Sequence, residues 1–115
     1  MPTYLLAHDL GTSGNKATLF TTDGTLVRSC TSGYGTRYYN GNWAEQNPED
    51  WWKAVCFSTK ELIQTIDPSE IAAIAFSGQM MGCLCVDRQG RPLRPSIIWA
   101  DQRAQAQQRA IGERI

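Results

Sequence analysis

The stretch His8-Asp9-Leu10-Gly11-Thr12-Ser13-Gly14-Asn15-Lys16 is the most informative part of this sequence. The apolar run from Tyr4 to Asp9 leads into it and predicts a strand that opens into a tight turn. A turn of this kind exposes backbone N–H groups, which can hold a phosphate together with the two hydroxyls and the Lys16 ammonium. Asp9 would repel the phosphate directly, so its expected role is to hold Mg²⁺ that bridges phosphate oxygens.

Two other interpretations of this turn remain open from the residues alone. The glycine spacing matches neither the P-loop nor the dinucleotide fingerprint, so the turn could be a plain hairpin whose Gly, Ser and Asn only satisfy the backbone. The letters Asp9-Leu10-Gly11-Thr12 also suggest an aspartic protease that works as a homodimer, with two aspartates sharing one proton. Leu10 counts against that reading, because that family usually has Thr or Ser there.

The residues after the turn predict a three-stranded meander. Lys16 to Thr21 and Thr25 to Ser32 are rich in β-branched and apolar residues, and Asp23-Gly24 supplies a tight turn between them. Residues 33–46 show no period of either kind and are predicted to form a surface loop.

A helix is predicted from Asn47-Pro48 to about Ile66, because Asn can cap it, Pro suits its first position and two acids follow. Its apolar stripe, with both tryptophans expected in the core, comprises Trp51, Trp52, Val55, Leu62, Ile63 and Ile66. Ile71 to Phe76 is continuously apolar and predicts a strand buried on both faces.

The last third of the chain predicts a second hairpin and a helix. The hairpin pairs Cys83–Val86 with Ile97–Trp99 around a turn at 87–90, and the helix opens at Asp101, where the aspartate is a candidate N-cap. No capping glycine or proline ends this helix before Ile115, so we expect the chain to be a piece of something longer.

Composition and charge exclude several classes of protein. The 115 residues correspond to one domain, and 11 basic against 11 acidic residues give a net charge of +0, so no overall field attracts nucleic acid or an anionic membrane. No apolar run approaches the ~20 residues of a membrane helix, and no export signal is visible, which predicts a cytoplasmic protein. The four cysteines lack metal-site spacing and are expected to be reduced, packed thiols.

Four motifs in the same order resemble the FGGY carbohydrate kinases, particularly the xylulokinase-like branch. Residues 9–17 (DLGTSGNKA) resemble the family's opening phosphate motif, and residues 43–52 (WAEQNPEDWW) resemble its entry to the first helix. Residues 77–82 (SGQMMG) resemble its sugar-facing loop, and residues 97–103 (IIWADQR) resemble its W-x-D-x-R segment. The resemblance covers essentially the whole chain.

The resemblance implies an α/β fold, the N-terminal portion of a ribonuclease-H-like (actin-like ATPase) domain: a three-stranded meander, helix, buried strand, hairpin and helix. Residues 1–115 would be the N-terminal part of the first kinase lobe, truncated and without the second lobe. The implied function of the full-length enzyme is ATP-dependent phosphorylation of a sugar hydroxyl. Carried over by residue, Asp9 would attend Mg²⁺; Thr12, Ser13, Gly14 and Lys16 would line the ATP phosphates; Gln79, Met80, Met81, Trp99, Asp101 and Arg103 would face or support the sugar.

One departure from the family leaves the sugar open. Xylulokinases usually have His where this chain has Met81, and glycerol kinases have Arg-Glu at the positions of Met80 and Met81. A thioether cannot donate a hydrogen bond to a hydroxyl, so we expect a less polar contact with a ketopentose or related ketose or polyol.

The resemblance also implies parts that this chain lacks. The catalytic aspartate is expected beyond residue 115, so the chain alone should be inactive, and its exposed strand edge is expected to pair with another copy. The alternative function is a non-catalytic sugar- or nucleotide-binding module that has kept the turn.

Overall fold

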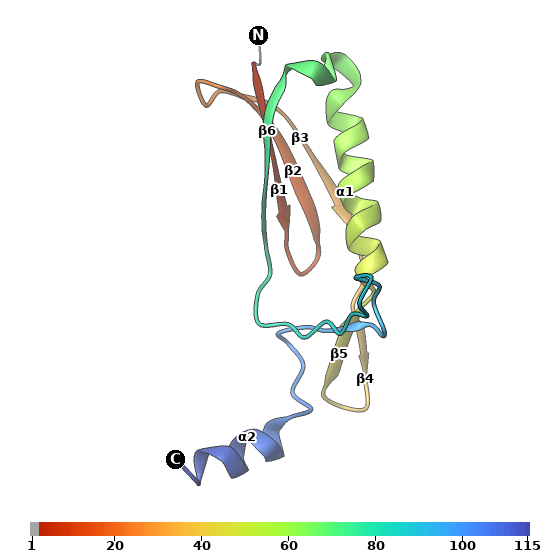
Figure 1. Cartoon of the computed structure of the whole chain (residues 1–115), viewed down its shortest axis with the longest axis vertical. Helices are drawn as coiled ribbons and strands as arrows, with labels where there is room; N and C mark the ends of the chain where they lie inside the picture. The colour runs from red at the N-terminus through yellow and green to blue at the C-terminus, as the bar shows by residue number, and fades with distance from the viewer. Residues whose placement is uncertain (1–2) are drawn as a thin grey trace. The chain divides into compact units, whose positions relative to one another are not determined.

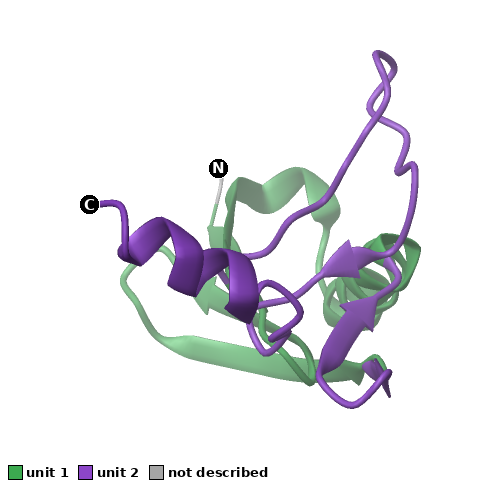
Figure 2. Ribbon diagram, turned by 90° about the horizontal axis from the view of Figure 1, so that it is seen from below, with its two compact units in different colours: residues 1–35, 48–79 green, residues 36–47, 80–115 purple. Residues whose placement is uncertain are grey.

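The computed structural model describes residues 3–115, which form two compact units (Figure 2). The first unit runs to Gly35 and resumes over residues 48–79, and the second comprises residues 36–47 and 80–115. Each unit is built on its own sheet, one of four strands and one of three.

The first unit contains a four-stranded sheet in the order β3-β2-β1-β6 (Figure 1). Strands β1 (Tyr4–Leu10), β2 (Gly14–Thr21) and β3 (Leu26–Gly33) are antiparallel neighbours, which confirms the predicted meander. Gly24 has a φ of 90° in the turn between β2 and β3, a conformation that glycine adopts without steric cost. Strand β6 (Ile71–Gly78) runs parallel to β1, as expected for a strand that follows a crossover helix.

Helix α1 (Pro48–Leu62) is the crossover, and it packs against β2 and β3. It ends four residues before the predicted Ile66, where a 3₁₀ turn (Ile63–Thr65) replaces the last helical turn. A second 3₁₀ turn (Pro68–Glu70) precedes β6. The core between helix and sheet consists of the buried side chains of Leu6, Ala17, Leu19 and Leu62.

Two burial predictions in this unit are wrong. Trp52 is 63% exposed because it lies on α1 outside the stripe that faces the sheet, where Ala54, Val55, Ser58 and Leu62 are buried instead. Strand β6 was expected to be buried on both faces, yet all its residues after Ile71 are exposed and Phe76 is 60% exposed. Strand β6 is exposed because it is the edge strand of the sheet, whereas α1 packs against β2 and β3.

The second unit contains a three-stranded sheet, β4-β5-β7, where the sequence predicted part of a loop. Strands β4 (Arg37–Tyr39) and β5 (Trp43–Gln46) form a hairpin, and β7 (Ser96–Ile97) pairs with β5. The surface-loop prediction for residues 33–46 is therefore wrong. Asn40 and Gly41, with φ of 50° and 80°, lie in the turn between β4 and β5. The sequence shows no alternation of apolar and polar residues here, because three consecutive residues of β5 are buried.

The rest of the second unit is less regular than predicted. The hairpin of residues 83–99 is reduced to two isolated bridges, Cys83 with Ile97 and Val86 with Pro92. Helix α2 (Gln105–Gly112) begins after Ala104 rather than at Asp101, so Asp101 is not its N-cap. All four cysteines are free, but Cys83 and Cys85 are exposed rather than packed. Among the described residues, no helix has the length and apolar character to cross a membrane.

Candidate functional site

The predicted phosphate turn closes the β1–β2 hairpin in the first unit. Gly11 N–H donates to the Gly14 carbonyl at 3.0 Å, which leaves Thr12 and Ser13 at the tip. The Tyr34 backbone N–H donates to the Ser13 carbonyl at 3.2 Å, and the Tyr34 hydroxyl donates to the Gly11 carbonyl. Protein donors thus occupy three carbonyls of the turn, which reduces the repulsion that an incoming phosphate would meet.

Gly14 is required by the neighbouring strand. A Cβ at this position would lie 2.7 Å from the Ser32 carbonyl oxygen, so a side chain would push β3 away from β2. The glycine is therefore explained by the close approach of two backbones, which is what brings Tyr34 under the turn.

A row of four exposed polar residues crosses the sheet beside the turn. In the strand register Lys16 pairs with Thr31 on β3 and with Asp9 on β1, and Asp9 pairs with Ser77 on β6. Directly paired residues project to the same side, here the face opposite to the buried His8 and Ala17. Residues 3–115 contain no cluster of three metal-ligating side chains, so Asp9 is a single carboxylate, which suits a Mg²⁺ that keeps its waters and phosphate ligands.

The backbone of Gln79 lies next to the turn. Its N–H donates to the Leu10 carbonyl at 2.8 Å, and the preceding Gly78 pairs with Leu10 in the parallel ladder. A Cβ on Gly78 would lie 2.9 Å from that carbonyl oxygen, so only glycine allows this contact. Gln79, the first of the predicted sugar-binding residues, therefore lies beside the start of the proposed phosphate turn. Both are at the carboxyl ends of the parallel strands β1 and β6.

His8 holds the turn from beneath. Its Nδ1 lies 3.0 Å from Asn15 Nδ2, its Nε2 lies 3.3 Å from the Thr59 hydroxyl, and its ring stacks on Phe76. Because the Thr59 hydroxyl donates to the Val55 carbonyl at 2.7 Å, His8 donates from Nε2 and accepts from Asn15 at Nδ1. Burial lowers the pKa of His8, so the ring is kept neutral.

The other predicted sugar residues lie in the second unit. Met80, Met81 and Trp99 are 76%, 87% and 50% exposed to solvent. Met81 has a φ of 64°, a left-handed conformation that costs free energy for any residue except glycine. The paired backbones of Cys83 and Ile97, at 2.8 and 3.0 Å, connect the methionine segment to the strand before Trp99.

Asp101 and Arg103 are bound to each other rather than open to a ligand. Asp101 Oδ1 accepts from the Arg103 backbone N–H and Nε, at 3.0 and 2.9 Å, and Oδ2 accepts from Arg103 Nη2 at 2.7 Å. These bonds outweigh burial and lower the pKa of Asp101 to about 2. The structure brings the two residues together, and each already has protein partners.

Sequence reasoning missed Glu45 and Tyr34 as functional candidates. Glu45 is 3% exposed and binds Arg103 and Arg94, which are more than 48 positions away in the sequence. No local sequence pattern therefore predicts that Glu45 is buried and paired. Tyr34 was assigned to a loop, and only the β2–β3 register places it under the turn. Burial and, second, the Asp9 carboxylate raise the pKa of its phenol, so it remains a hydrogen-bond donor.

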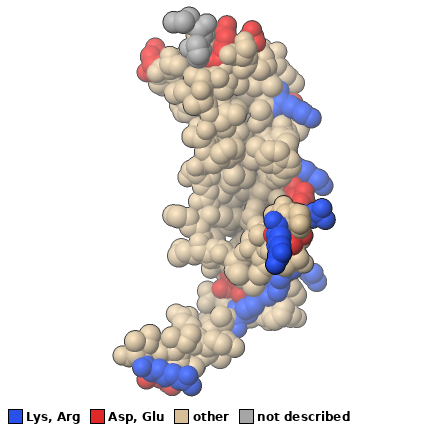
Figure 3. All heavy atoms as spheres, viewed as in Figure 1, with Lys and Arg blue, Asp and Glu red and all other residues tan. Residues whose placement is uncertain are grey.

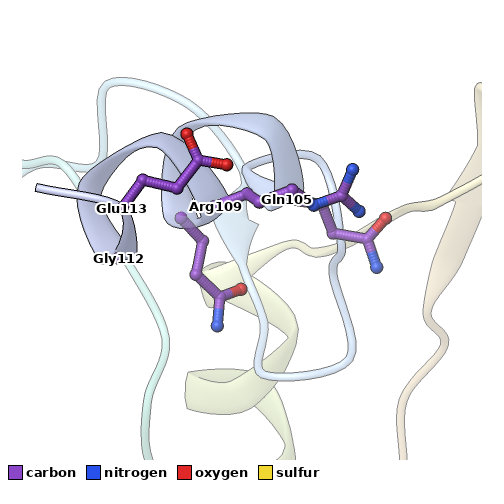
Figure 4. A pocket seen from close by; sticks show the side chains of 5 residues that line it. Gln105, Arg109, Gly112 and Glu113 are labelled. Carbon is purple, nitrogen blue, oxygen red and sulfur yellow. The ribbon is translucent and has the colours of Figure 1, made fainter.

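Two of the cavities lie away from the predicted site residues. One of about 450 Å³ is an open hollow along α2 lined by polar groups, among them Gln105, Arg109 and Glu113 (Figure 4). An apolar groove of about 310 Å³ lies between α1 and β6, where Trp52, Ile74 and Phe76 line it. Neither contains a residue of the predicted phosphate or sugar sites.

A mixed sheet with a crossover helix, and an acid-glycine turn at the carboxyl end of its first strand, define the N-terminal domain of an actin-like ATPase fold. The FGGY family of carbohydrate kinases, N-terminal domain, matches residues 4–115, and the chain belongs to this family. The family match overturns the aspartic-protease alternative.

The relatives divide among three kinds of carbohydrate kinase: xylulose, glycerol and gluconate kinases. The chain is 34% identical to a xylulose kinase of Staphylococcus xylosus over 87% of its length, and 40% identical to a glycerol kinase of a Nostoc species over the same share. A gluconate kinase structure from Lactobacillus acidophilus covers 96% of the chain at 32% identity with a TM-score of 0.90. The chain spans 21%, 21% and 22% of these three proteins, respectively.

Proposed function

We propose that this chain is the N-terminal part of the first lobe of a carbohydrate kinase that transfers the γ-phosphoryl group of ATP to a sugar hydroxyl. The observation that carries the proposal is the Asp9–Lys16 cross-strand pair beside a turn whose first residues also anchor Gln79. Opposite charges on one exposed face suit a metal–phosphate complex, because the Asp9 carboxylate would bind the metal and the Lys16 ammonium would bind the phosphate.

Phosphoryl transfer joins the sugar oxygen to the γ-phosphorus and breaks its bond to the leaving ADP oxygen. In the proposal, the ATP phosphates contact the turn through Thr12, Ser13, Gly14 and Lys16, and Asp9 holds Mg²⁺. Bound Mg²⁺ would neutralise charge on the phosphates, and Lys16 would stabilise the charge that builds up on the transferred group. In this proposal, the base that takes the hydroxyl proton lies in a longer polypeptide, and the xylulose kinase that this chain matches is about four times as long as the chain.

The substrate we propose is a ketopentose or related ketose or polyol. Xylulose, glycerol and gluconate kinases resemble this chain about equally, so identity alone does not select one. The exposed Met80, Met81 and Trp99 offer apolar and aromatic surface, which suits the C–H face of a sugar better than its hydroxyl edge. Gln79 would supply hydrogen bonds to hydroxyls. We place this reaction in the cytoplasm, where ATP is supplied and free thiols persist.

The test is ADP release by the complete protein that carries this sequence, with intact mass measured on the same sample. We expect a mass several times that of this chain and ADP release that depends on one sugar from a panel of ketoses, polyols and aldonates. Sugar binding without ADP release would instead support a non-catalytic binding module. A native mass equal to that of the 115-residue chain with no ADP release would overturn the kinase assignment.

We also propose that the 115-residue chain by itself self-associates through β6. This edge strand has no charged residue or proline in Ile71–Gly78, and the surface over β6 is free of charged side chains (Figure 3). Uncharged edges pair readily with a second edge. Sedimentation should show a dimer that Ala73→Lys, a charge in the strand, converts to monomer; a monomeric parent chain would disprove it.

A further inference from the structure

Two carboxylates are buried in the second unit, and both carry a charge. The side chains of Glu45 on β5 and Asp101 after β7 are each 4% exposed. Isolated buried carboxylates are strongly unfavourable, so these two are stable only because cationic and hydrogen-bonding partners surround them. The arrangement of the partners is what gives the cluster a role.

Arg103 connects the two carboxylates. Its Nη2 lies 2.7 Å from Glu45 Oε2 and 2.7 Å from Asp101 Oδ2, and its guanidinium stacks over the Trp43 ring at 3.9 Å. Arg94 binds the same oxygen of Glu45 and is more exposed, with 44% of its side chain open to solvent. A guanidinium held by two acids and a ring has one orientation available, because its donors are fixed in a plane.

Asp101 connects Arg103 to the turn that contains Trp99 through hydrogen bonds. Its Oδ2 accepts the Ala44 N–H at 2.7 Å, and its own N–H donates to the Ile98 carbonyl at 3.0 Å. The Ile98 N–H donates to the Ala44 carbonyl at 3.2 Å. Both ends of the turn Ile98–Asp101 are therefore bound to the same residue of β5, and Trp99 lies between them.

We infer that Glu45 is a positioning residue for Trp99, acting through Arg103 and Asp101, and that these two residues orient the turn rather than contact the sugar. The inference rests on the proposed function only where it names the sugar as the ligand of Trp99. Burial supports it, because the Asp101 and Arg103 side chains are 4% and 16% exposed while Trp99 is half exposed. The cluster fixes geometry more than stability, because buried ion pairs contribute little net free energy compared with apolar packing.

The first experiment reads the position of Trp99 without any substrate. The chain is labelled with 5-fluorotryptophan, and the Trp99 signal is assigned by its loss in Trp99→Phe. We expect Glu45→Gln to shift or split the Trp99 signal and leave those of Trp51 and Trp52 unchanged. The control is Glu113→Gln, which removes the same charge from an exposed site at the end of α2. An unchanged Trp99 signal in a folded Glu45→Gln chain would overturn the inference.

The second experiment measures the complete protein. Glu45→Gln should raise the KM for the sugar roughly 10- to 100-fold, since small displacements of a positioning group have effects of this size, and leave the KM for ATP unchanged. Equal losses for sugar and ATP would contradict a positioning role. If the parent protein releases no ADP with any sugar, the proposed function fails, whereas the fluorine spectra still decide the role of Glu45.

Two further variants keep the inference testable if Glu45→Gln does not fold. Arg103→Lys keeps the charge but cannot bridge both carboxylates with a planar fork, so it should displace the Trp99 signal as Glu45→Gln does. Arg94→Ala removes only the exposed partner of Glu45 and should leave the Trp99 signal in place. The reverse order of effects would show that the cluster does not act through Arg103.

Discussion

Asp9 on β1 and Lys16 on β2 are direct cross-strand partners, and both side chains are exposed on the face of the sheet opposite to the core. Opposite charges on two paired, exposed residues stabilise the hairpin only slightly, because interactions between exposed charges contribute about 0–1 kcal/mol. In the proposed function, the two residues together bind a metal–phosphate ligand. Mutation of either residue should therefore reduce activity while leaving the free energy of unfolding nearly unchanged.

Lys16→Met should reduce ADP release by the complete protein about 100-fold, because in the proposed function it removes a cation from the transferred phosphate. The free energy of unfolding of the chain should change by less than about 1 kcal/mol. Steady-state kinetics and urea unfolding measure the two quantities. Lys53→Met, an exposed lysine on α1, is the matched control and should alter neither.

The only histidine of the chain should control its stability between neutral and mildly acidic pH. Burial lowers the pKa of His8 in the folded state, so the unfolded chain binds the proton more readily. Stability should therefore fall as the pH drops below about 6.5, the unfolded value, because a protonated Nδ1 cannot accept from Asn15. Urea unfolding at pH 7.5 and 5.5 tests this, and His8→Gln should remove the difference. An equal pH effect in both proteins would assign it to carboxylates.

Asp101 should contribute stability that is lost in acid. Its pKa is lowered to about 2, mainly by the hydrogen bonds from Arg103, so its contribution is present above about pH 4 and disappears as the pH falls toward 2. After allowance for solvent screening, the contribution is on the order of 1 kcal/mol. Asp101→Asn should lower the free energy of unfolding at pH 7 by that amount and flatten its dependence below pH 4, whereas Glu113→Gln should do neither.

Ser58→Ala should stabilise the chain. The Ser58 hydroxyl on α1 is fully buried and has no hydrogen-bond partner within residues 3–115, so removing it relieves a desolvation cost of about 1 kcal/mol. The neighbouring Thr59→Val is the contrast, because the Thr59 hydroxyl binds the Val55 carbonyl and His8 and its loss should destabilise by a similar amount. Thermal unfolding of both variants measures this, and a lower melting temperature for Ser58→Ala would show that its hydroxyl has a partner.

Met81→Gly should separate stability from sugar binding. Glycine adopts the φ of 64° without the steric cost that methionine bears, so the chain should gain up to about 1 kcal/mol. The KM for the sugar should rise in the complete protein, because the exposed thioether is lost. Met80→Gly, which has no positive φ to relieve, should gain no stability. If both variants behave alike, the Met81 conformation is not strained.

The sequence by itself determined the elements whose signals are local. The meander, the start of α1 at Pro48 and the turn at residues 11–14 follow from residue types within a few positions of each other, and the structure has them within a few residues of the predictions. The residues of the proposed phosphate turn could be selected for the same reason, because its glycines, hydroxyls and lysine lie in one short segment, and their role stays a prediction.

Tertiary structure alone decided which of these elements are buried and which charges meet. An apolar strand such as β6 has the same letters whether it is central or at an edge, and only the strand order shows that it is at an edge. Glu45 is buried and ionised because Arg94 and Arg103, 49 and 58 positions later, reach it. Pairing between residues so far apart in the sequence depends on the tertiary fold, which no pattern within a few residues predicts.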